Sequence, residues 1–302
     1  MLNNSRVLPA RLRGIKAATG GQIEMLLVEE NGVNDWWVML RPGKRVRAGT
    51  QIHFLDPEEK ITGIGAMVCE KNSEGHCRLI FSGTSNVLAA LNFLGETPLP
   101  PYITRSTPAQ LAADRERYQT VYAQPAGSVA APTAGLHYSD PLMAQIRARG
   151  VQICFVTLHV GLATFAPVKT ETVADHIMHE ERFELGTTTA QCVNEAKRSG
   201  RRVIAVGTTT VRVLESVAAD NEGKLVATTG RTGIFIYPAY TFKVVDALQT
   251  NFHLSQSTLL MLVCAFAAPG ETRGRELVLS TYAEAIRQRY RFYSYGDAML
   301  IL

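Results

Sequence analysis

The stretch Arg202–Ser216, RVIAVGTTTVRVLES, contains a strand, a tight turn and the start of a helix. The run up to Val206 is apolar and rich in β-branched residues, as a buried parallel strand requires. Gly207 interrupts the run, and a series of threonines then stands where a helix N-cap belongs, followed by apolar residues at helical spacing. This stretch therefore predicts a strand-turn-helix unit of an α/β domain.

The turn of this unit is a candidate anion-binding site. Thr208, Thr209 and Thr210 would direct hydroxyl groups and free backbone N–H groups toward one point, which is how helix N-termini hold a carboxylate, a phosphate or a ribose. Arg212 in the first helical turn could add a guanidinium to those donors. Glu215 could pair with Arg212 or with a ribose, and an exposed ion pair between the two is the ordinary alternative. Most such turns are plain scaffolding, so the turn alone does not establish a site.

The first third of the chain has a different pattern, because residues 10–85 consist of short β-prone runs separated by turn signals. The expected strands are Gln22–Val28, Trp36–Leu40, Gln51–Leu55, Ile61–Glu70 and Cys77–Phe81. A helix is expected after Ser85, ending at Gly95. We therefore expect a small antiparallel barrel or sandwich over residues 1–97, with the first few residues belonging to the other domain.

Helical and strand patterns alternate over residues 98–302, which predicts an α/β domain with a partly parallel sheet. The proline-rich residues 98–101 mark the passage into it. The expected strands are Val151–Leu158, Val203–Val206 and Ile234–Tyr237. The expected helices are Pro141–Arg149, Thr189–Arg198, Val211–Ala219, Thr258–Ala267 and Glu276–Tyr290.

The composition is that of a soluble protein with a packed core. Hydrophobic residues make up 46% and charged residues 19% of 302 positions, a length sufficient for two domains. The net charge of +4 is compatible with an RNA partner and equally with an ordinary enzyme. The 5 cysteines lack metal-ligand spacing and are expected to be free thiols in a reducing cytosol. No apolar run is long enough to span a bilayer, so we expect a cytoplasmic protein without a membrane partner.

Two histidines lie at positions where an α/β domain often carries chemistry. His137 lies in a loop of small residues ahead of a helix that Ser139 could cap, and its ordinary pKa allows proton transfer near neutrality. His159 closes the expected strand Val151–Leu158, and ligands of open α/β sheets bind outside the carboxyl ends of strands. Each imidazole could instead simply hold its own loop.

His176, His179 and Glu180 would share one face if their segment were helical. The spacing is not that of a zinc protease and a fourth ligand is absent, so a role in acid-base chemistry or substrate contact is favoured over a metal site. Asn251 and His253 flank Phe252, and such a trio can bind a nucleobase by edge hydrogen bonds and stacking, or can pack beneath the following helix.

A basic turn on the β-domain is the clearest electrostatic candidate for an RNA contact. It contains Arg41, Lys44, Arg45 and Arg47. Basic hairpin ends are also common on unrelated surfaces. Near the C-terminus, residues 290–297 interleave aromatic and polar side chains, which fits RNA stacking or the edge of a core.

Several long sequence motifs, in a fixed order along the chain, carry a resemblance to a known family. They are PLPPYI (98–103), RYQTVYAQPAGSVAAPTAGLHYS (117–139), FVTLHVGLATFAPV (155–168), DHIMHEE (175–181), IFIYPAYTFKVVDALQTNFHL (234–254), STLLMLVCAF (257–266) and YRFYSYGDAMLI (290–301). Together they resemble the S-adenosylmethionine:tRNA ribosyltransferase-isomerase family of queuosine biosynthesis. The resemblance runs through nearly all of residues 99–302 and more loosely through 1–98, and it implies a catalytic α/β domain with a smaller antiparallel β-barrel domain attached.

The resemblance also implies a reaction. Members of the family that this sequence resembles transfer the ribosyl part of S-adenosylmethionine onto the aminomethyl group of a 7-deazaguanine base at the tRNA wobble position, and they isomerise it. Epoxyqueuosine forms, and adenine and methionine are released. We therefore expect the tRNA anticodon loop and S-adenosylmethionine as partners, no further cofactor, no bound metal, and a monomer.

Site roles follow from the same resemblance. The chemistry needs a base near C5′ of the sulfonium and a donor for departing adenine, and His137, His159, His176 and His253 share these roles without a firm assignment. The Thr208–Thr210 turn and Arg212 would hold the methionine carboxylate or an RNA phosphate.

The chain also departs from the family pattern. Its first residues align with the start of the VxNxTRVxPARL motif that the relatives share, and in a typical member this motif begins about fifty residues into the sequence. Ala163, Ala239 and Ser255 stand where relatives usually show Gly, Gly and Pro. The alternative expectation is a trimmed homologue that binds tRNA or a nucleoside without catalysis, and an unrelated small-molecule enzyme is a third possibility.

Overall fold

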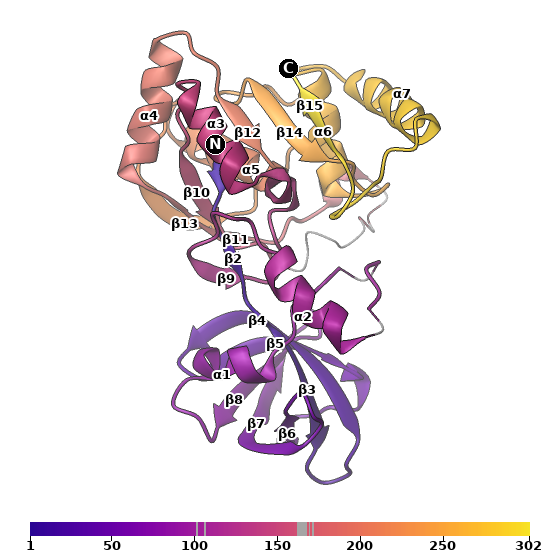
Figure 1. The fold of residues 1–302 in the computed structure, drawn as a ribbon. Helices are drawn as coiled ribbons and strands as arrows, with labels where there is room; N and C mark the ends of the chain where they lie inside the picture. The colour runs from indigo at the N-terminus through magenta and orange to yellow at the C-terminus, as the bar shows by residue number, and fades with distance from the viewer. Residues whose placement is uncertain (101, 106, 162–167, 169, 171) are drawn as a thin grey trace. The chain divides into compact units, whose positions relative to one another are not determined.

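The computed structural model describes residues 1–100, 102–105, 107–161, 168, 170 and 172–302. The chain forms two compact units, each with its own core (Figure 1). One unit comprises Val7–Tyr118, and the other comprises Met1–Arg6 with Gln119–Leu302. The chain therefore begins in the second unit, passes through the first and returns.

The Val7–Tyr118 unit is built on a closed six-stranded barrel of antiparallel neighbours in the order β3-β4-β5-β8-β7-β6 (Figure 1). Alternate side chains of its strands point inward, and Leu12, Met25 and Phe54 are among the fully buried ones. The strands are β3 (Arg11–Lys16), β4 (Gln22–Gly32), β5 (Asp35–Arg41), β6 (Gln51–Leu55), β7 (Ile61–Lys71) and β8 (Cys77–Ser82). The predicted antiparallel β-domain is confirmed, and the alternative left open between barrel and sandwich is decided for the barrel.

Two α-helices accompany the barrel strands. Helix α1 (Val87–Leu94) begins at Asn86, whose side chain accepts from the Leu88 N–H. Helix α2 (Pro108–Arg117) starts with a capping box between Thr107 and Gln110, and the sequence reading missed it. A short 3-10 turn, η1 (Gly43–Arg45), follows β5.

The units divide after Tyr118, whereas we expected the domain boundary after residue 97. A physical reason lies in α2, because the Arg115 guanidinium donates to the carbonyls of Asn92 and Gly95 at 3.0 and 2.7 Å. The fully buried Tyr118 ends the same segment. These contacts tie residues 98–118 to the barrel unit.

The second unit contains a seven-stranded sheet in the order β13-β11-β10-β1-β12-β14-β15. The four central strands are mutually parallel, namely β1 (Leu2–Asn3), β10 (Phe155–Leu158), β12 (Ile204–Val206) and β14 (Ala247–Asn251). The outer strands β11 (Glu181–Leu185), β13 (Thr228–Thr232) and β15 (Ala298–Ile301) pair antiparallel. The predicted α/β fold with a partly parallel sheet is confirmed. Separately, β2 (Arg6–Val7) pairs with β9 (Ala126–Ser128).

Helices pack against this sheet and against each other. They are α3 (Asp140–Ala148), α4 (Thr187–Arg198), α5 (Thr208–Asp220), α6 (Thr258–Ala267) and α7 (Gly274–Arg287), with 3-10 turns η2 (Thr133–His137) and η4 (Val173–Asp175). The largest core cluster joins α5 residues such as Leu214 to Leu158 and Leu248 of the sheet. Helices α6 and α7 lie side by side, with Phe252, Val263 and Tyr282 buried among them (Figure 1).

Two local predictions were wrong. Ile234–Tyr237 is apolar but forms no strand; instead the Phe235 ring packs against His176 and Tyr237. The segment from His176 to Glu180 is not helical, since η4 ends at Asp175 and β11 starts at Glu181. Its three side chains therefore do not share a helix face.

Among the described residues, no helix combines the length and the apolar character that crossing a bilayer demands.

Candidate functional site at the strand ends

The carboxyl ends of four parallel strands meet at one edge of the sheet. Strands β10, β1, β12 and β14 end at Leu158, Asn3, Val206 and Asn251, so the residues after them lie along a common edge. This is the edge at which open α/β sheets bind ligands. His159, the Thr208–Thr210 turn and the Asn251–His253 loop, all candidates from the sequence, follow three of these strands.

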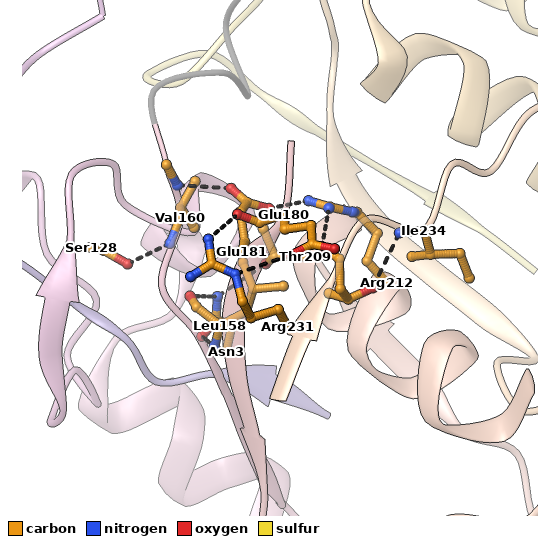
Figure 2. Close-up of polar contacts among 12 residues, drawn as sticks. Asn3, Ser128, Leu158, Val160, Glu180, Glu181, Thr209, Arg212, Arg231 and Ile234 are labelled. Carbon is orange, nitrogen blue, oxygen red and sulfur yellow. Dashed lines mark hydrogen bonds and ion pairs between the residues drawn. The ribbon is translucent and has the colours of Figure 1, made fainter. Parts of the chain in front are cut away.

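Asn3 connects three of the elements at this edge. Its buried amide nitrogen donates to the Leu158 carbonyl at 3.0 Å and to the Thr209 hydroxyl at 3.2 Å. Its amide oxygen accepts from the backbone N–H groups of Leu158 and Ser5 at 3.0 and 3.1 Å. These four bonds use the full hydrogen-bonding capacity of the amide. Asn3 is labelled beside Leu158 in Figure 2. Asn3 therefore fixes β10, β1 and α5 relative to one another.

The hydroxyl groups of the threonine turn are used largely within the protein. Thr210 donates to the Val206 carbonyl at 2.7 Å, and Thr209 accepts from Asn3. Gly207 has φ +86°, a backbone conformation that glycine adopts readily, and it lets the chain turn sharply from β12 into α5. The backbone N–H groups of Thr208, Thr209 and Thr210 make no hydrogen bond within the described residues. The anion-binding capacity of this turn therefore resides in its backbone.

Arg212 forms a buried ion pair with Glu181, a residue that the sequence reading missed. The two side chains are 4% and 6% exposed, and the Arg212 guanidinium donates to one Glu181 carboxylate oxygen. The other oxygen accepts from the Gly161 N–H at 2.7 Å. Figure 2 shows Glu181 between the Val160 segment and Arg212. The Arg212 charge is thus neutralised within the protein, and the pair holds the end of β10 against α5.

The remaining donors of Arg212 also point inward. One terminal nitrogen donates to the Thr232 carbonyl at 3.4 Å, and the buried Nε has no hydrogen-bond partner within the described part of the chain. These contacts favour a structural role over the carboxylate or phosphate contact expected from the sequence. No isolated motif could have identified Glu181, because its partner lies on a distant segment.

Glu215 anchors a loop instead of pairing with Arg212. Its carboxylate is fully buried and accepts from the backbone N–H groups of Lys243, Val244 and Val245 at 2.8, 3.0 and 3.0 Å. The Tyr240 hydroxyl donates to it at 3.3 Å. The expected exposed ion pair with Arg212 is therefore wrong, and the carboxylate has no oxygen left for a ribose.

His159 lies at the end of a series of contacts between hydroxyl groups. Its Nδ1 lies 3.5 Å from the Ser5 hydroxyl, which contacts the Ser128 hydroxyl. The Ser128 oxygen in turn accepts from the Val160 N–H at 2.9 Å. Gly127 lies against the imidazole, because a Cβ at that position would be 2.6 Å from Nδ1. The ring is thus held by a neighbouring backbone on one side and a serine on another.

Burial determines which group donates in each hydrogen bond of this series. Ser5 and Ser128 are 0% exposed, so each hydroxyl hydrogen needs an acceptor within the protein. Only one direction supplies both through the contacts described, with Ser128 donating to Ser5 and Ser5 donating to Nδ1 of His159. Neutral His159 then carries its proton on Nε2. Burial, and next the nearby Arg182 charge, lower the pKa of His159, so the neutral form prevails near neutrality.

His137 and Asn251 belong to a neighbouring group at the end of β14. The Thr133 hydroxyl donates to the Asn251 side-chain oxygen at 2.9 Å, and the Asn251 amide donates to the Tyr293 carbonyl at 3.3 Å. His137 is exposed at the end of η2, and partial burial lowers its pKa, which Asp297 raises to a lesser extent. The C-terminal stretch with its aromatic and polar residues therefore lies beside η2.

The turn η2 also contacts the threonine turn. A Cβ placed on Gly207 would be 3.7 Å from the Ala134 Cβ, and Ala134 packs with Leu2 and Val206 in one small cluster. Through η2, the structure thus links the turn after β12 to Asn251 after β14.

Phe252 is buried, and His253 beside it is half-buried. The His253 Nε2 contacts the Thr250 hydroxyl at 2.8 Å, and its backbone N–H donates to the Tyr282 hydroxyl at 2.9 Å. Burial lowers the pKa of His253 to about 4. Phe252 stacks on Phe292 at 4.7 Å and is buried. The sequence left open whether this trio binds a nucleobase or packs beneath the following helix, and Phe252 packs in the core.

His176 and His179 take different positions. The His176 ring meets the Phe235 ring edge at 5.1 Å, while His179 is exposed. Glu180 pairs with Arg231 at 3.2 Å. Within the described residues, no group of three or more His, Cys, Asp or Glu side chains is arranged to hold a metal ion.

A family model described as queuosine biosynthesis protein matches residues 1–301. The chain belongs to this family. It is similar to a solved structure, the S-adenosylmethionine tRNA ribosyltransferase from Thermotoga maritima, with 34% sequence identity. The match covers 100% of this chain and 81% of that one, at a TM-score of 0.46. The family resemblance seen in the sequence is confirmed.

In this queuosine-family chain, the basic turn predicted to contact RNA lies at an end of the barrel. Arg41, Lys44, Arg45 and Arg47 are all exposed, and the buried Val46 anchors the turn. The turn occupies η1 and the residues flanking it, between β5 and β6. Its charges are therefore available to a partner in solution.

Proposed function

We propose that this protein transfers the ribosyl part of S-adenosylmethionine to the 7-aminomethyl-7-deazaguanine base at the tRNA wobble position and isomerises it. The products are epoxyqueuosine in the tRNA, adenine and methionine. The observation that carries this proposal is the family match over residues 1–301. The 34% identity to a tRNA ribosyltransferase along the whole chain supports it.

The reaction needs a base and a hydrogen-bond donor. The sulfonium of S-adenosylmethionine acidifies the C5′ protons, so a neutral imidazole can remove one, and the charge that develops on departing adenine needs a hydrogen-bond donor. His159 suits the donor role, because the serine chain leaves its ring proton on Nε2. His137 suits the base, because it is exposed to an incoming substrate and its pKa, lowered by partial desolvation, keeps the imidazole neutral near pH 7.

The other histidines suit these roles less well. The Nε2 of His253 is engaged by Thr250, and the low pKa of His253 makes it a weak base. His176 and His179 remain candidates for substrate contact, with Phe235 beside His176 as an aromatic surface.

The methionine carboxylate or an RNA phosphate would be held by the backbone N–H groups of Thr208, Thr209 and Thr210 at the start of α5. Beyond its bonds to Thr133 and Tyr293, the Asn251 amide retains one N–H and one oxygen lone pair with which it would contact the substrate. S-adenosylmethionine is a co-substrate, and the scheme requires no further cofactor. On the barrel, Arg41, Lys44, Arg45 and Arg47 would contact the tRNA near its anticodon loop.

The decisive experiment supplies precursor-bearing tRNA together with S-adenosylmethionine labelled in its ribosyl group. We expect label in the tRNA and stoichiometric free adenine. Replacing the ring hydrogen-bond donor in His159→Gln should lower turnover by about 10²- to 10³-fold. The matched control is His53→Gln, which changes an exposed histidine on β6 of the barrel and should turn over like the original protein.

Two outcomes would overturn the proposal. Binding of tRNA without any adenine release would support the non-catalytic homologue. Adenine release in the absence of tRNA, or no interaction with tRNA at all, would support an unrelated small-molecule enzyme.

A further inference from the structure

Six basic side chains occupy one end of the barrel. In an antiparallel barrel, the carboxyl ends of β3, β5 and β7 lie at the same end, and these strands finish at Lys16, Arg41 and Lys71. The β5–β6 connection at that end adds three more cations. The basic end thus comprises Lys16, Arg41, Lys44, Arg45, Arg47 and Lys71.

Two of these lysines come from distant strands and contact the turn directly. The Lys16 ammonium donates to the Arg45 carbonyl at 2.9 Å, and the Lys71 ammonium donates to the Gly43 carbonyl at 3.3 Å. Both contacts are to backbone oxygens of η1, so neither lysine loses its positive charge. Lys16 and Lys71 therefore hold the turn in place and add to its charge.

The basic end lacks neutralising carboxylates, in contrast to the rest of the barrel. None of its six side chains forms an ion pair within the described residues. Elsewhere on the barrel strands and their connections, cations have a carboxylate partner, as in Arg11 with Glu24, Arg13 with Glu96, Lys60 with Glu58 and Arg78 with Asp35.

Acidic residues near this end are already engaged. Glu24 stands opposite Arg41 in the β4–β5 ladder but pairs with Arg11 at 3.6 Å. Glu70 pairs with Arg78 at 2.9 Å, and Glu74 lies 3.3 Å from the His76 Nδ1. The surplus of positive charge at the basic end is therefore not cancelled by neighbouring residues.

A concentration of like charges repels itself unless an anion binds it. Nucleic acid phosphates are such an anion, and their contact with lysine and arginine releases counterions. We propose that Lys16 and Lys71 complete, with the Arg41–Arg47 turn, a phosphate-binding surface that holds the tRNA backbone whatever the state of the wobble base. The choice of tRNA rests on the proposed function. Phosphate contacts carry no base information, so precursor-bearing and unmodified tRNA bind this surface equally.

Two double variants separate the charge from the support of the turn. Lys16→Gln with Lys71→Gln keeps a side-chain N–H donor for each carbonyl and removes both charges. Lys16→Arg with Lys71→Arg keeps the charges. The matched control is Lys60→Gln, because Lys60 lies in the β6–β7 connection at the opposite end of the barrel and is paired with Glu58.

The experiment measures binding of both tRNA forms by fluorescence anisotropy over a series of KCl concentrations. The glutamine pair should bind more weakly, and the slope of log affinity against log salt should fall in magnitude by about 1 to 2. The arginine pair and Lys60→Gln should retain the original slope. Thermal unfolding of each variant checks that the barrel remains folded.

Three results would overturn the proposal. The first is an unchanged slope in the glutamine pair. The second is an equal loss in the arginine pair, which would show that only the shape of the turn matters. The third is that the glutamine pair weakens the binding of the precursor-bearing tRNA but not of the unmodified tRNA. Adenine release is measured separately, so a protein that binds tRNA through this surface without turnover would refute the proposed function and leave the surface standing.

Discussion

The strand-end edge of the α/β unit and the basic end of the barrel both carry an arginine in the segment that follows a strand, yet the two arginines do different things. Arg212 is buried and pairs with Glu181, whereas Arg45 is exposed and has no carboxylate partner within the described residues. Both looked like anion-binding groups in the sequence. The comparison teaches that burial and a carboxylate from a distant segment decide whether an arginine holds the fold together or meets a ligand.

The largest effect should come from removing Arg212. In Arg212→Ala the Glu181 carboxylate stays buried without its cation, which should lower the free energy of unfolding of the α/β unit by about 3 to 5 kcal/mol. Arg45→Ala at an exposed site should change the stability of the barrel by no more than about 0.5 kcal/mol.

The two units can be followed separately in one urea titration. Both tryptophans, Trp36 and Trp37, lie on β5, so tryptophan fluorescence reports the barrel. Helical circular dichroism comes mostly from α3 to α7 of the other unit. Arg212→Ala should shift the circular dichroism transition alone. If it instead weakened substrate binding while stability stayed unchanged, the comparison would break and Arg212 would be a ligand contact.

The next effect is a pH dependence confined to the α/β unit. The pKa of His253 is about 4 in the folded protein and about 6.5 when unfolded, so the unfolded chain takes up the proton first. The associated stability is fully present above pH 6.5 and is lost as the pH falls toward 4, by about 3 kcal/mol. His137 and His159, whose pKa values burial also lowers, act in the same direction.

Unfolding by urea at pH 7, 5 and 4 measures this dependence. In His253→Asn the free energy of unfolding obtained from the circular dichroism transition should depend less on pH, and this holds even if the variant is less stable at pH 7. Equal slopes in the variant and the original protein would show that His253 titrates normally.

A smaller change should affect activity more than stability. In Gly127→Ala the new methyl group would be 2.6 Å from the His159 Nδ1, so the imidazole must move. A displacement of about 1 Å at a catalytic group can cost about 10²-fold in turnover, while overpacking costs about 1 to 3 kcal/mol of stability, to which the φ of +154° at Gly127 adds backbone strain. Gly186→Ala is the control, because a Cβ there meets nothing within 4 Å. Full activity in Gly127→Ala would remove His159 from the reaction.

Five of the six barrel strands could be predicted because they are β-prone runs that end at strong turn signals, whereas β3 (Arg11–Lys16) was not predicted. The bounds of β6 agree with the expected Gln51–Leu55, and β7 and β8 extend their predicted runs by only a residue. The partly parallel sheet was also predictable, since β12 and α5 are encoded in one short stretch. The α2 helix was not predicted because its sequence is polar and follows a proline-rich segment.

The strand-end edge could be predicted only in part, because its contacts join segments far apart in the chain. Strand β14, ALQTN, was missed since half-polar residues hide a central parallel strand, and apolar Ile234–Tyr237 was mistaken for one. Glu181 has no local signal. Ala239 has φ +78°, a conformation that costs an L-residue about 1 to 2 kcal/mol and that no local pattern predicted.

The smallest expected effect tests whether the buried edge fixes even the position of a proton. Neutral His159 should carry its proton on Nε2 alone, because the buried Ser128 and Ser5 hydroxyls leave Nδ1 as the final acceptor. Ring 15N chemical shifts above pH 7 distinguish this single tautomer from an exchanging mixture. Ser5→Ala removes the donor to Nδ1 and with it about 1 kcal/mol of preference, so the shifts should move toward those of a mixture. His53, exposed on the barrel, should show the mixture in both proteins. Unchanged His159 shifts in Ser5→Ala would mean that the hydroxyl chain does not direct the ring, and His159 would then have no built-in preference for donating to adenine.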